Sequence, residues 1–184
     1  MVFSEFEVEE IGFKFGDDPT YTSVKCVGSS EEEMESRTVE KYCRGRLAKR
    51  TTRGTGSGTV TLSLHIPYDL YIKAYGMNLD TLKEGVHAYG ENSRHAKCSM
   101  VQRVADEDGN IKYKAYPNGL ISGAKASKIE NGAEEVAEVE LEFGFTADEY
   151  GNGMYEALAE GLAEEIKSKW MTAFEPSLVQ AATV

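Results

Sequence analysis

The sequence predicts one α+β domain that is mainly β: an antiparallel β-sandwich or barrel with a long hairpin and a flanking C-terminal amphipathic helix. Hydrophobic and polar residues alternate over several separate segments, which is typical of strands with one buried face. The 184 residues include 18 glycines, 10 tyrosines and 7 phenylalanines but only 4 prolines, a composition that favours strands joined by glycine-containing turns. Apolar residues recur at helical spacing near the C-terminus, which predicts the helix.

The N-terminal segment begins with a predicted strand. Residues 4–9 alternate between glutamates on one side and apolar residues on the other, and Phe13 and Phe15 continue the pattern. Residues 16–36 then break the periodicity with an Asp-Asp-Pro sequence, a Gly-Ser-Ser sequence and a run of three glutamates. This composition predicts a mobile acidic loop around one short strand near residues 24–27.

A long hairpin is predicted over residues 37–66. Its first strand covers about residues 37–49, and its second covers residues 59–66, where Val60, Leu62, Leu64 and Ile66 alternate with polar residues. The glycine-rich residues 50–58 between them predict a flexible hairpin tip.

The middle of the chain combines one short helix with further strands. Pro67 and Gly76 delimit a predicted helix over residues 68–75, because proline favours a helix start and glycine a helix end. Residues 78–95 have no clear pattern. Residues 98–105 and 111–116 predict a hairpin with an Asp-Gly turn. Further strands are predicted over residues 120–129 and 135–145.

A C-terminal amphipathic helix is predicted over residues 154–173. One apolar stripe defines its packing face and consists of Tyr155, Leu158, Leu162, Ile166 and Trp170. Pro176 is expected to end the ordered domain, so residues 1–176 form one domain with extended loops at 16–36 and 50–58. Residues 177–184 are expected to be a flexible tail.

The charge distribution is consistent with an ordinary solvated strand face or with a surface whose negative charge has a function. The formal net charge is −11, which opposes binding of nucleic-acid phosphates. Residues 130–166 contain no Lys or Arg, and the strand they include places three glutamates in a row at a cost in stability. The candidates for this surface are Glu138, Glu140 and Glu142, followed by Glu5, Glu7 and Glu9.

One segment has the opposite charge. Residues 41–53 contain six Lys or Arg residues and no acid, and they lie in the predicted hairpin. Because the rest of the chain is acidic, another copy of the same chain is the simplest partner, and the complementary charges would set the register of the contact. The candidate inter-subunit residues are Arg44, Arg46, Lys49, Arg50 and Arg53.

Catalytic and metal-binding patterns are largely missing from the sequence. His95 and Cys98 are three residues apart, which suits half of a metal site or a weak nucleophile–base pair, but no second pair completes either arrangement. We therefore expect no enzyme activity, no metal and no cofactor. The three cysteines form no disulfide framework, and no apolar run is long enough to span a membrane. The acidic N-terminus lacks the layout of a signal peptide, so we expect folding in a reducing cytoplasm.

Residues 53–77, RGTGSGTVTLSLHIPYDLYIKAYGM, resemble the major tail protein family of siphophages that infect Gram-positive bacteria. The order of hairpin, short helix, further strands, acidic strand and C-terminal helix is similar over most of the chain. The resemblance implies a β-sandwich with a flanking helix that forms hexameric rings, and the rings stack into a hollow tube. Strands of the six subunits would line the lumen as a continuous barrel, and an extended loop would hold the neighbouring ring.

The expected function is therefore a structural subunit of a bacteriophage tail tube, located in the virion tail and assembled in the host bacterial cytoplasm. The resemblance implies a tape-measure protein, a tail terminator and baseplate or tail-tip proteins as further partners. DNA would pass through a negative lumen without being bound. The alternatives are a terminator or a tube protein of a contractile particle, a small-ligand-binding β-barrel, and an enzyme that uses Cys98 and His95.

Overall fold

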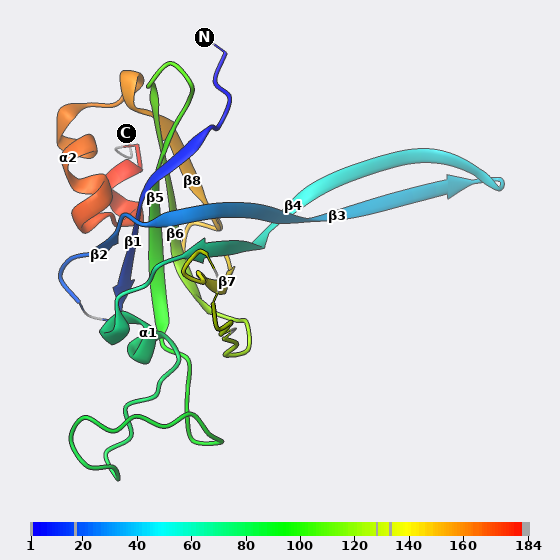
Figure 1. The fold of residues 1–184 in the computed structure, drawn as a ribbon. Helices are drawn as coiled ribbons and strands as arrows, with labels where there is room; N and C mark the ends of the chain where they lie inside the picture. The colour runs from blue at the N-terminus through cyan, green and yellow to red at the C-terminus, as the bar shows by residue number, and fades with distance from the viewer. Residues whose placement is uncertain (1, 17, 128, 133, 182–184) are drawn as a thin grey trace.

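The computed structural model describes residues 2–16, 18–127, 129–132 and 134–181. Over these residues the chain forms eight strands, two α-helices and two short 3₁₀ turns (Figure 1). The strands are β1 (Glu7–Phe15), β2 (Thr22–Val24), β3 (Val27–Cys43), β4 (Arg46–Leu64), β5 (Lys97–Ala105), β6 (Ile111–Ile121), β7 (Val139–Phe145) and β8 (Tyr155–Leu158). The helices are α1 (Tyr68–Ala74) and α2 (Glu164–Ala173), and the 3₁₀ turns are Ala159–Gly161 and Pro176–Val179.

All strand pairs are antiparallel and belong to one sheet. The strand order is β2-β1-β5-β6-β7-β4-β3, and β8 pairs with β6 beside this path. The sheet folds over, so that β3 and β4 cross in front of β5 and β6 in Figure 1. The predicted fold class, α+β and mainly β, is confirmed.

The main core fills the space between the two halves of the folded sheet. Every second residue is buried in it over the end of β1, over Val60–Leu64 of β4 and over Leu141–Phe145 of β7, as a strand period of two requires. These residues are Ile11, Phe13, Phe15, Val60, Leu62, Leu64, Leu141, Phe143 and Phe145. Helix α1 adds Leu70, Ile72 and Ala74 to the same cluster.

A second, smaller core lies under α2. The helix covers the opposite face of β5 and β6, where Trp170 and Phe174 pack against Tyr21, Val101 and Ala115. The Trp170 indole donates a hydrogen bond from Nε1 to the Lys114 carbonyl oxygen at 3.2 Å. Strands β5 and β6 are therefore buried on both faces, and α2 is the outer layer.

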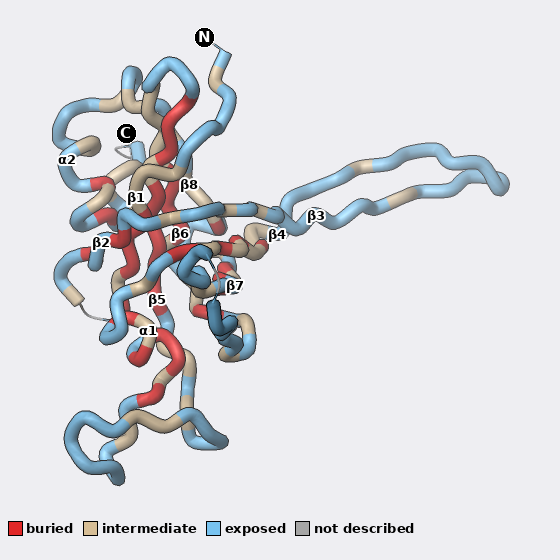
Figure 2. Tube along the Cα trace, viewed as in Figure 1, coloured by how far each residue is buried: buried red, intermediate tan, exposed pale blue. Residues whose placement is uncertain are grey.

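Strands β3 and β4 continue beyond the body as a two-stranded arm, defined here as residues 35–57. Strand β4 pairs with β7 only over Gly58–Leu64, so beyond that point β3 and β4 pair only with each other. Nearly every residue of the arm is exposed (Figure 2). The arm reverses at Arg44 and Gly45, whose φ angles are 51° and 73°. Positive φ at both residues is the geometry that matches the twist of a two-residue hairpin turn.

The glycine-rich stretch lies at the base of the arm. Met34 pairs with Gly58 and Ser36 with Gly54, so three residues of β4 lie opposite one residue of β3. Gly56 has a φ of 77°, and a Cβ on Gly58 would lie 2.4 Å from the Glu33 carbonyl oxygen. The glycines are required for this bulge and close approach.

Several predicted elements are confirmed. These are the N-terminal strand, the long hairpin, the helix after Pro67, the irregular segment at 78–95, the hairpin of β5 and β6, and the strand that ends at Phe145. The N-terminal strand begins at Glu7, later than predicted. The last strand begins at Val139, also later than predicted.

Three loop and strand predictions are wrong. Residues 27–36 of the predicted mobile loop belong to β3, because their alternate side chains, including Ser30 and Glu32, bond to groups inside the body. Residues 50–58 belong to β4, so the predicted tip is part of a strand. The predicted strand at 120–129 stops at Ile121, where β6 leaves its pairing with β7.

The predicted helix at 154–173 is correct only from Glu164 onward. Residues 155–158 form β8 instead, because a tight turn at Asp148–Asn152 returns the chain to pair with β6. The predicted flexible tail contains a 3₁₀ turn whose Leu178 and Val179 pack against the second core. Residues 182–184 of that tail lie outside the described residues. Neither helix among the described residues has the length and apolar character needed to cross a membrane.

Trp170→Ala is expected to lower the free energy of unfolding by about 3–5 kcal/mol, because the side chain is fully buried and its removal leaves a large cavity. Urea denaturation followed by far-ultraviolet circular dichroism measures this change. Lys169→Ala on the same helix is the control, because Lys169 makes only an exposed pair with Glu165. Equal stability of the two variants would contradict the packing role of α2.

Candidate functional site

An acidic face lies on the outer side of β7, β4 and β3, opposite the main core. The register of the three strands places their outward side chains in rows, with hydroxyl residues in the middle and carboxylates on both sides. We define the acidic face as Ser29, Glu31, Glu33, Thr59, Thr61, Ser63, Glu140 and Glu142. These positions alternate with core residues on β4 and β7, and with Ser30 and Glu32, which bond inside the body, on β3. The register of the acidic face is therefore as fixed as that of the body behind it.

Among the described residues, hydroxyl groups and no Lys or Arg side chains contact the carboxylates of this face. Ser63 donates a hydrogen bond from Oγ to Glu138 Oε2 at 2.6 Å, which joins Glu138 to the edge of the face. Ser122 donates from Oγ to Glu142 Oε1 at 2.8 Å. The face itself contains no Lys or Arg, and like charges along neighbouring strands oppose folding. The negative charge of this surface therefore adds repulsion to the folded chain.

Glu31 and Glu33 were absent from the predicted acidic surface. They belong to the glutamate run that was predicted to lie in a loop. In the structure they lie on β3 and pair with Thr61 and Thr59 of β4. The detectable signal was alternation: Ser29, Glu31 and Glu33 are outward, whereas the intervening residues are partly buried. The strand period was hidden because all these residues are polar.

The second predicted set of acidic residues lies elsewhere. Glu5 forms ion pairs with Lys112 and Lys114, at 2.7 and 2.8 Å, and Glu9 pairs with Arg103 at 2.8 Å. Glu7 begins β1 and pairs with Ala105 in the ladder. Two of these three charges are thus balanced by neighbouring cations, unlike those of the acidic face.

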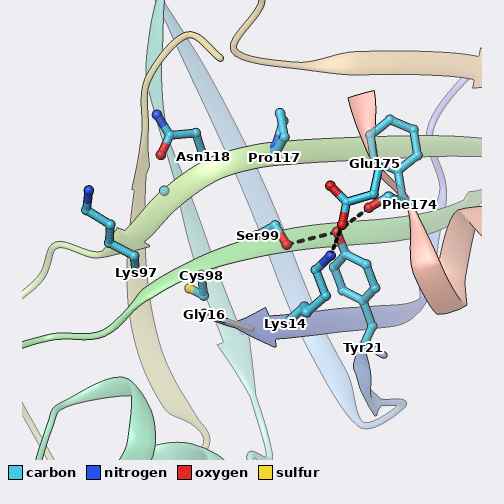
Figure 3. A pocket seen from close by; sticks show the side chains of 11 residues that line it. Lys14, Gly16, Tyr21, Lys97, Cys98, Ser99, Pro117, Asn118, Phe174 and Glu175 are labelled. Carbon is cyan, nitrogen blue, oxygen red and sulfur yellow. Dashed lines mark hydrogen bonds and ion pairs between the residues drawn. The ribbon is translucent and has the colours of Figure 1, made fainter. Parts of the chain in front are cut away.

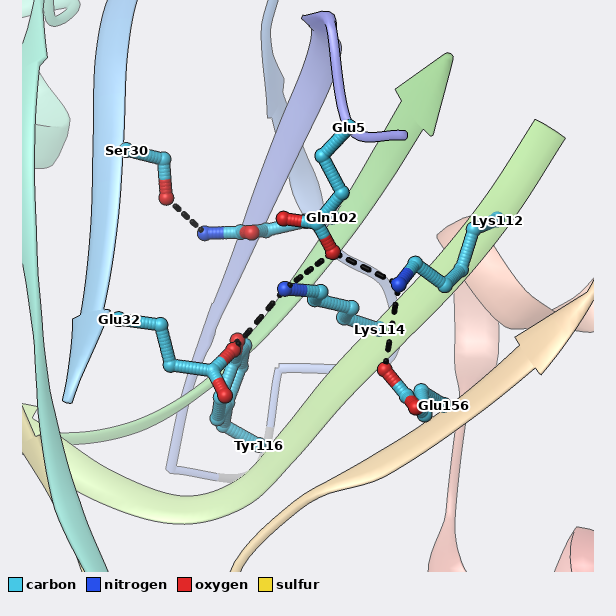
Figure 4. A network of polar contacts seen from close by, with 8 residues as sticks. All are labelled: Glu5, Ser30, Glu32, Gln102, Lys112, Lys114, Tyr116 and Glu156. Atoms are coloured by element: carbon cyan, nitrogen blue, oxygen red, sulfur yellow. Dashed lines mark hydrogen bonds and ion pairs between the residues drawn. The ribbon is translucent and has the colours of Figure 1, made fainter. Parts of the chain in front are cut away.

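A polar network inside the body holds β3 against β6 and the N-terminal segment (Figure 4). Buried Lys114 lies between Glu5 and Glu32, with Nζ to Glu32 Oε2 at 3.1 Å. The Tyr116 hydroxyl donates to the same Glu32 carboxylate. Gln102 donates from Nε2 to Ser30 Oγ at 3.0 Å.

Opposite charges in this network shift the pKa values of their neighbours toward the charged forms. Burial lowers the pKa of Lys114, but its contacts with Glu5 and Glu32 outweigh burial and leave the pKa raised. Burial raises the pKa of Glu5, but Lys112 and Lys114 outweigh it and leave the pKa lowered. Burial, together with the Glu32 charge, raises the pKa of the Tyr116 phenol well above its usual range. The lysine and the Glu5 carboxylate therefore stay charged at neutral pH, and the phenol remains a donor.

The arm has one cationic face. Arg37 lies opposite Arg53 and Lys41 opposite Lys49, so like charges face each other across the two strands. Together with Val39 and Thr51 between them, these residues line a groove of about 440 Å³. We call these six residues the cationic groove. The side chain of Val39 at its centre is 54% exposed, so an apolar group faces solvent there.

The predicted arm residues divide between this groove and other positions. Lys49 and Arg53 line the cationic groove. Arg50 lies on the opposite face and pairs with Glu40, with Nη2 to Oε1 at 2.5 Å. Arg44 is in the turn and Arg46 is beside Cys43 at the tip. Arg37 and Lys41 were missed as site residues, because only the strand register shows that they face Arg53 and Lys49.

The predicted helix-packing stripe is only partly correct. Trp170 is buried, and Leu162, Ile166 and Tyr155 pack partly buried against the second core. Tyr155 reaches it from β8, however, and Leu158 at the end of β8 is 36% exposed.

A small pocket lies beside the end of β1 (Figure 3). Its volume is about 200 Å³, and Tyr21 donates a hydrogen bond to Ser99 Oγ at 2.9 Å within it. Lys14 and Glu175 form an ion pair at its mouth. Pockets for small organic ligands usually have volumes of roughly 300–1,000 Å³ and apolar walls. This pocket therefore fits a ligand-binding β-barrel poorly.

His95 and Cys98 do not form a reactive pair. His95 contacts the Ile121 carbonyl through Nδ1 at 2.6 Å and the Tyr89 hydroxyl through Nε2 at 3.0 Å, so both ring nitrogens have other partners. Burial raises the pKa of the Cys98 thiol to about 12, which keeps it protonated. Among the described residues, no group of three His, Cys, Asp or Glu side chains is placed to hold a metal ion.

Comparison with known proteins shows a shared fold. No known family profile matches the sequence, and no curated protein is similar to it. The tube-terminating cap of the anti-feeding prophage superposes with a TM-score of 0.51 at 11% identity, covering 86% of this chain and 95% of the cap chain. A chain of the anti-feeding prophage baseplate has a TM-score of 0.45 at 12% identity, with 85% of this chain and 97% of that chain covered. The predicted siphophage family membership stays a prediction.

In the native protein at pH 8, Ellman's reagent is expected to modify Cys26 and Cys43 but not Cys98. The first two thiols are exposed, whereas Cys98 is buried with a raised pKa. Absorbance measured with single Cys→Ser variants assigns each thiol, and the same assay in urea should reveal Cys98. Rapid modification of Cys98 in the folded protein would revive the enzyme alternative.

Proposed function

We propose that this chain is a non-enzymatic structural subunit of a phage-tail-like tube and functions by assembling with copies of itself. The acidic face carries the proposal, because it adds charge repulsion to a folded domain and so requires a role outside folding. The shared fold with a tube-terminating cap supports a tail component. The resemblance of residues 53–77 to siphophage major tail proteins supports the tube itself.

In this proposal the acidic face lines the lumen. The strands that carry it have open edges: β3 ends the sheet, and β7 pairs with β6 only from Phe143 to Phe145. Ser122 and Gly123 donate backbone hydrogen bonds to the Glu142 carbonyl, so the open part of β7 is Val139–Leu141. Pairing of these edges between neighbouring copies would extend the sheet around a ring and remove both edges. A lumen of carboxylates and hydroxyls repels phosphates, whereas a basic lumen would bind DNA through counterion release.

The family resemblance supplies the ring number, the partners and the location in this proposal. Rings would be hexameric and stacked, with a tape-measure protein inside during assembly and with terminator and baseplate or tail-tip proteins at the ends. The arm would contact a copy in a neighbouring ring. The protein would be made in the cytoplasm of a host bacterium and reside in the virion tail, without a cofactor.

A tube-terminating cap is the second candidate function. The TM-score of 0.51 with such a cap favours it, since the chain covers nearly all of that protein. A cap ends a tube, so it forms single rings, whereas a tube subunit adds ring upon ring. Tube length therefore separates the two functions.

Negative-stain microscopy of the purified protein at high concentration is expected to show stacked rings that form hollow tubes. Isolated rings would favour the cap instead. A chain that stays monomeric in analytical ultracentrifugation at the same concentration would contradict both functions.

Replacing Glu31, Glu140 and Glu142 with Lys is expected to leave the fold intact but to make the lumen retain DNA. Tubes assembled with short double-stranded DNA should then protect it from nuclease at low salt and release it at high salt. The matched control changes the same residues to Gln, which removes charge without adding cations. If tubes of the Lys variant protect no DNA, the acidic face does not line the lumen.

A further inference from the structure

We propose that residues 134–138 of a second copy bind along β3 of the arm as an added strand, with Glu134, Val136 and Glu138 over the cationic groove. This inference rests on the proposed function, in which the arm contacts another copy, and it names the segment that the arm recognises. The ligand is thus a short acidic segment with one central apolar residue.

The arm offers both an open edge and unbalanced charge. Strand β3 is the last strand of the sheet, so its outer backbone groups are available for a further strand. Like charges face each other at both ends of the groove, which destabilises an isolated two-stranded ribbon. An acidic strand beside β3 would reverse that repulsion and would cover Val39.

The segment before β7 has the complementary properties. Glu134, Glu135 and Glu138 are exposed, and Val136 among them is 82% exposed. The segment forms no regular structure in the single chain, although strand β7 begins at the next residue, Val139. An extended conformation therefore breaks no helix or strand, although Glu138 would exchange its hydrogen bond from Ser63 Oγ for the contact with Arg37.

The spacing of the two sequences agrees. Arg37, Val39 and Lys41 are two residues apart and share one face of β3. In an extended segment, Glu134, Val136 and Glu138 share one face at the same spacing. Antiparallel addition places Glu138 beside Arg37, Val136 beside Val39 and Glu134 beside Lys41. The two charges of each partner are then about 13 Å apart, at four strand residues of roughly 3.3 Å.

The arm cannot reach this segment of its own chain. Val139 pairs with Leu64, which is the end of β4 farthest from the arm, and the arm leaves the body beyond Gly58. From Leu64 to Arg53, β4 spans eleven residues, or roughly 35 Å of extended strand. The cationic groove and residues 134–138 therefore meet only between two copies.

A cysteine-pair experiment tests the contact directly. Val39→Cys and Val136→Cys are introduced together into the full chain after Cys26→Ser and Cys43→Ser, and assembled protein is oxidised and run on a non-reducing gel. We expect crosslinks between copies at about tenfold the yield of the matched control, Val39→Cys with Ile129→Cys, since Ile129 is equally exposed but has no place in the groove. Equal yields in assembled tubes would overturn this inference and leave the proposed function intact.

Charge exchange gives an independent measurement. Arg37→Glu with Lys41→Glu should raise the concentration needed for assembly by about tenfold or more, because two attractions become repulsions. Adding Glu134→Lys and Glu138→Lys should restore assembly toward the original concentration. Lys25→Glu with Lys83→Glu makes the same charge change on the body and should have little effect. If the added Glu134→Lys and Glu138→Lys changes do not restore assembly of the Arg37→Glu, Lys41→Glu variant, the inference is overturned. A wild-type chain that never assembles would overturn the proposed function as well.

Discussion

The pairing of β4 with β7 over seven residues is the interaction on which the rest of the molecule depends. One side of this pair buries Val60, Leu62 and Leu64 with Leu141 and Phe143, and the other side holds Glu140 and Glu142 beside hydroxyl groups. The period of two makes the two sides inseparable, because a slip by one residue would bury the glutamates and expose the core. Hydrophobic burial thus fixes the position of every charge on the acidic face.

Much of this architecture could be predicted wherever polar and apolar residues alternate. The second half of β4 and the end of β7 are examples, because their buried side chains are large, apolar and separated by polar residues or glycine. Strand β3 could not be predicted over residues 27–36, since its inward residues are Ser30 and Glu32. Those residues bond to Gln102, Lys114 and Tyr116, which are distant in sequence.

Two further errors came from local signals with more than one structural meaning. The glycines between residues 54 and 58 suit a turn as well as a bulge, and only the approach of Glu33 decides for the bulge. Tyr155 and Leu158 fit a helical stripe, yet in β8 they lie on opposite faces, and Tyr155 and Ala157 are the residues that pack against the second core. In both places tertiary contacts outweighed the local preference.

The sign of the charge in each segment could be predicted, but its arrangement could not. The sequence indicated a basic hairpin and an acidic strand. The face-to-face pairs of Arg37 with Arg53 and Lys41 with Lys49 depend on the turn at Arg44 and on a register shift between Lys41 and Tyr42. Likewise, Glu5 and Glu140 are equivalent in sequence pattern. Only the fold shows that lysines neutralise Glu5, whereas no described Lys or Arg pairs with Glu140.

In the proposed assembly, the exposed, two-stranded arm has a consequence for timing. A ribbon without a core is only marginally stable in water, so the free chain would sample many arm orientations and lose that freedom when it joins a partner. This entropy cost penalises the first encounter of two free chains more than addition to an ordered end, where several contacts form together. The arm would thereby create a nucleation barrier, which keeps newly made subunits apart until a template is present.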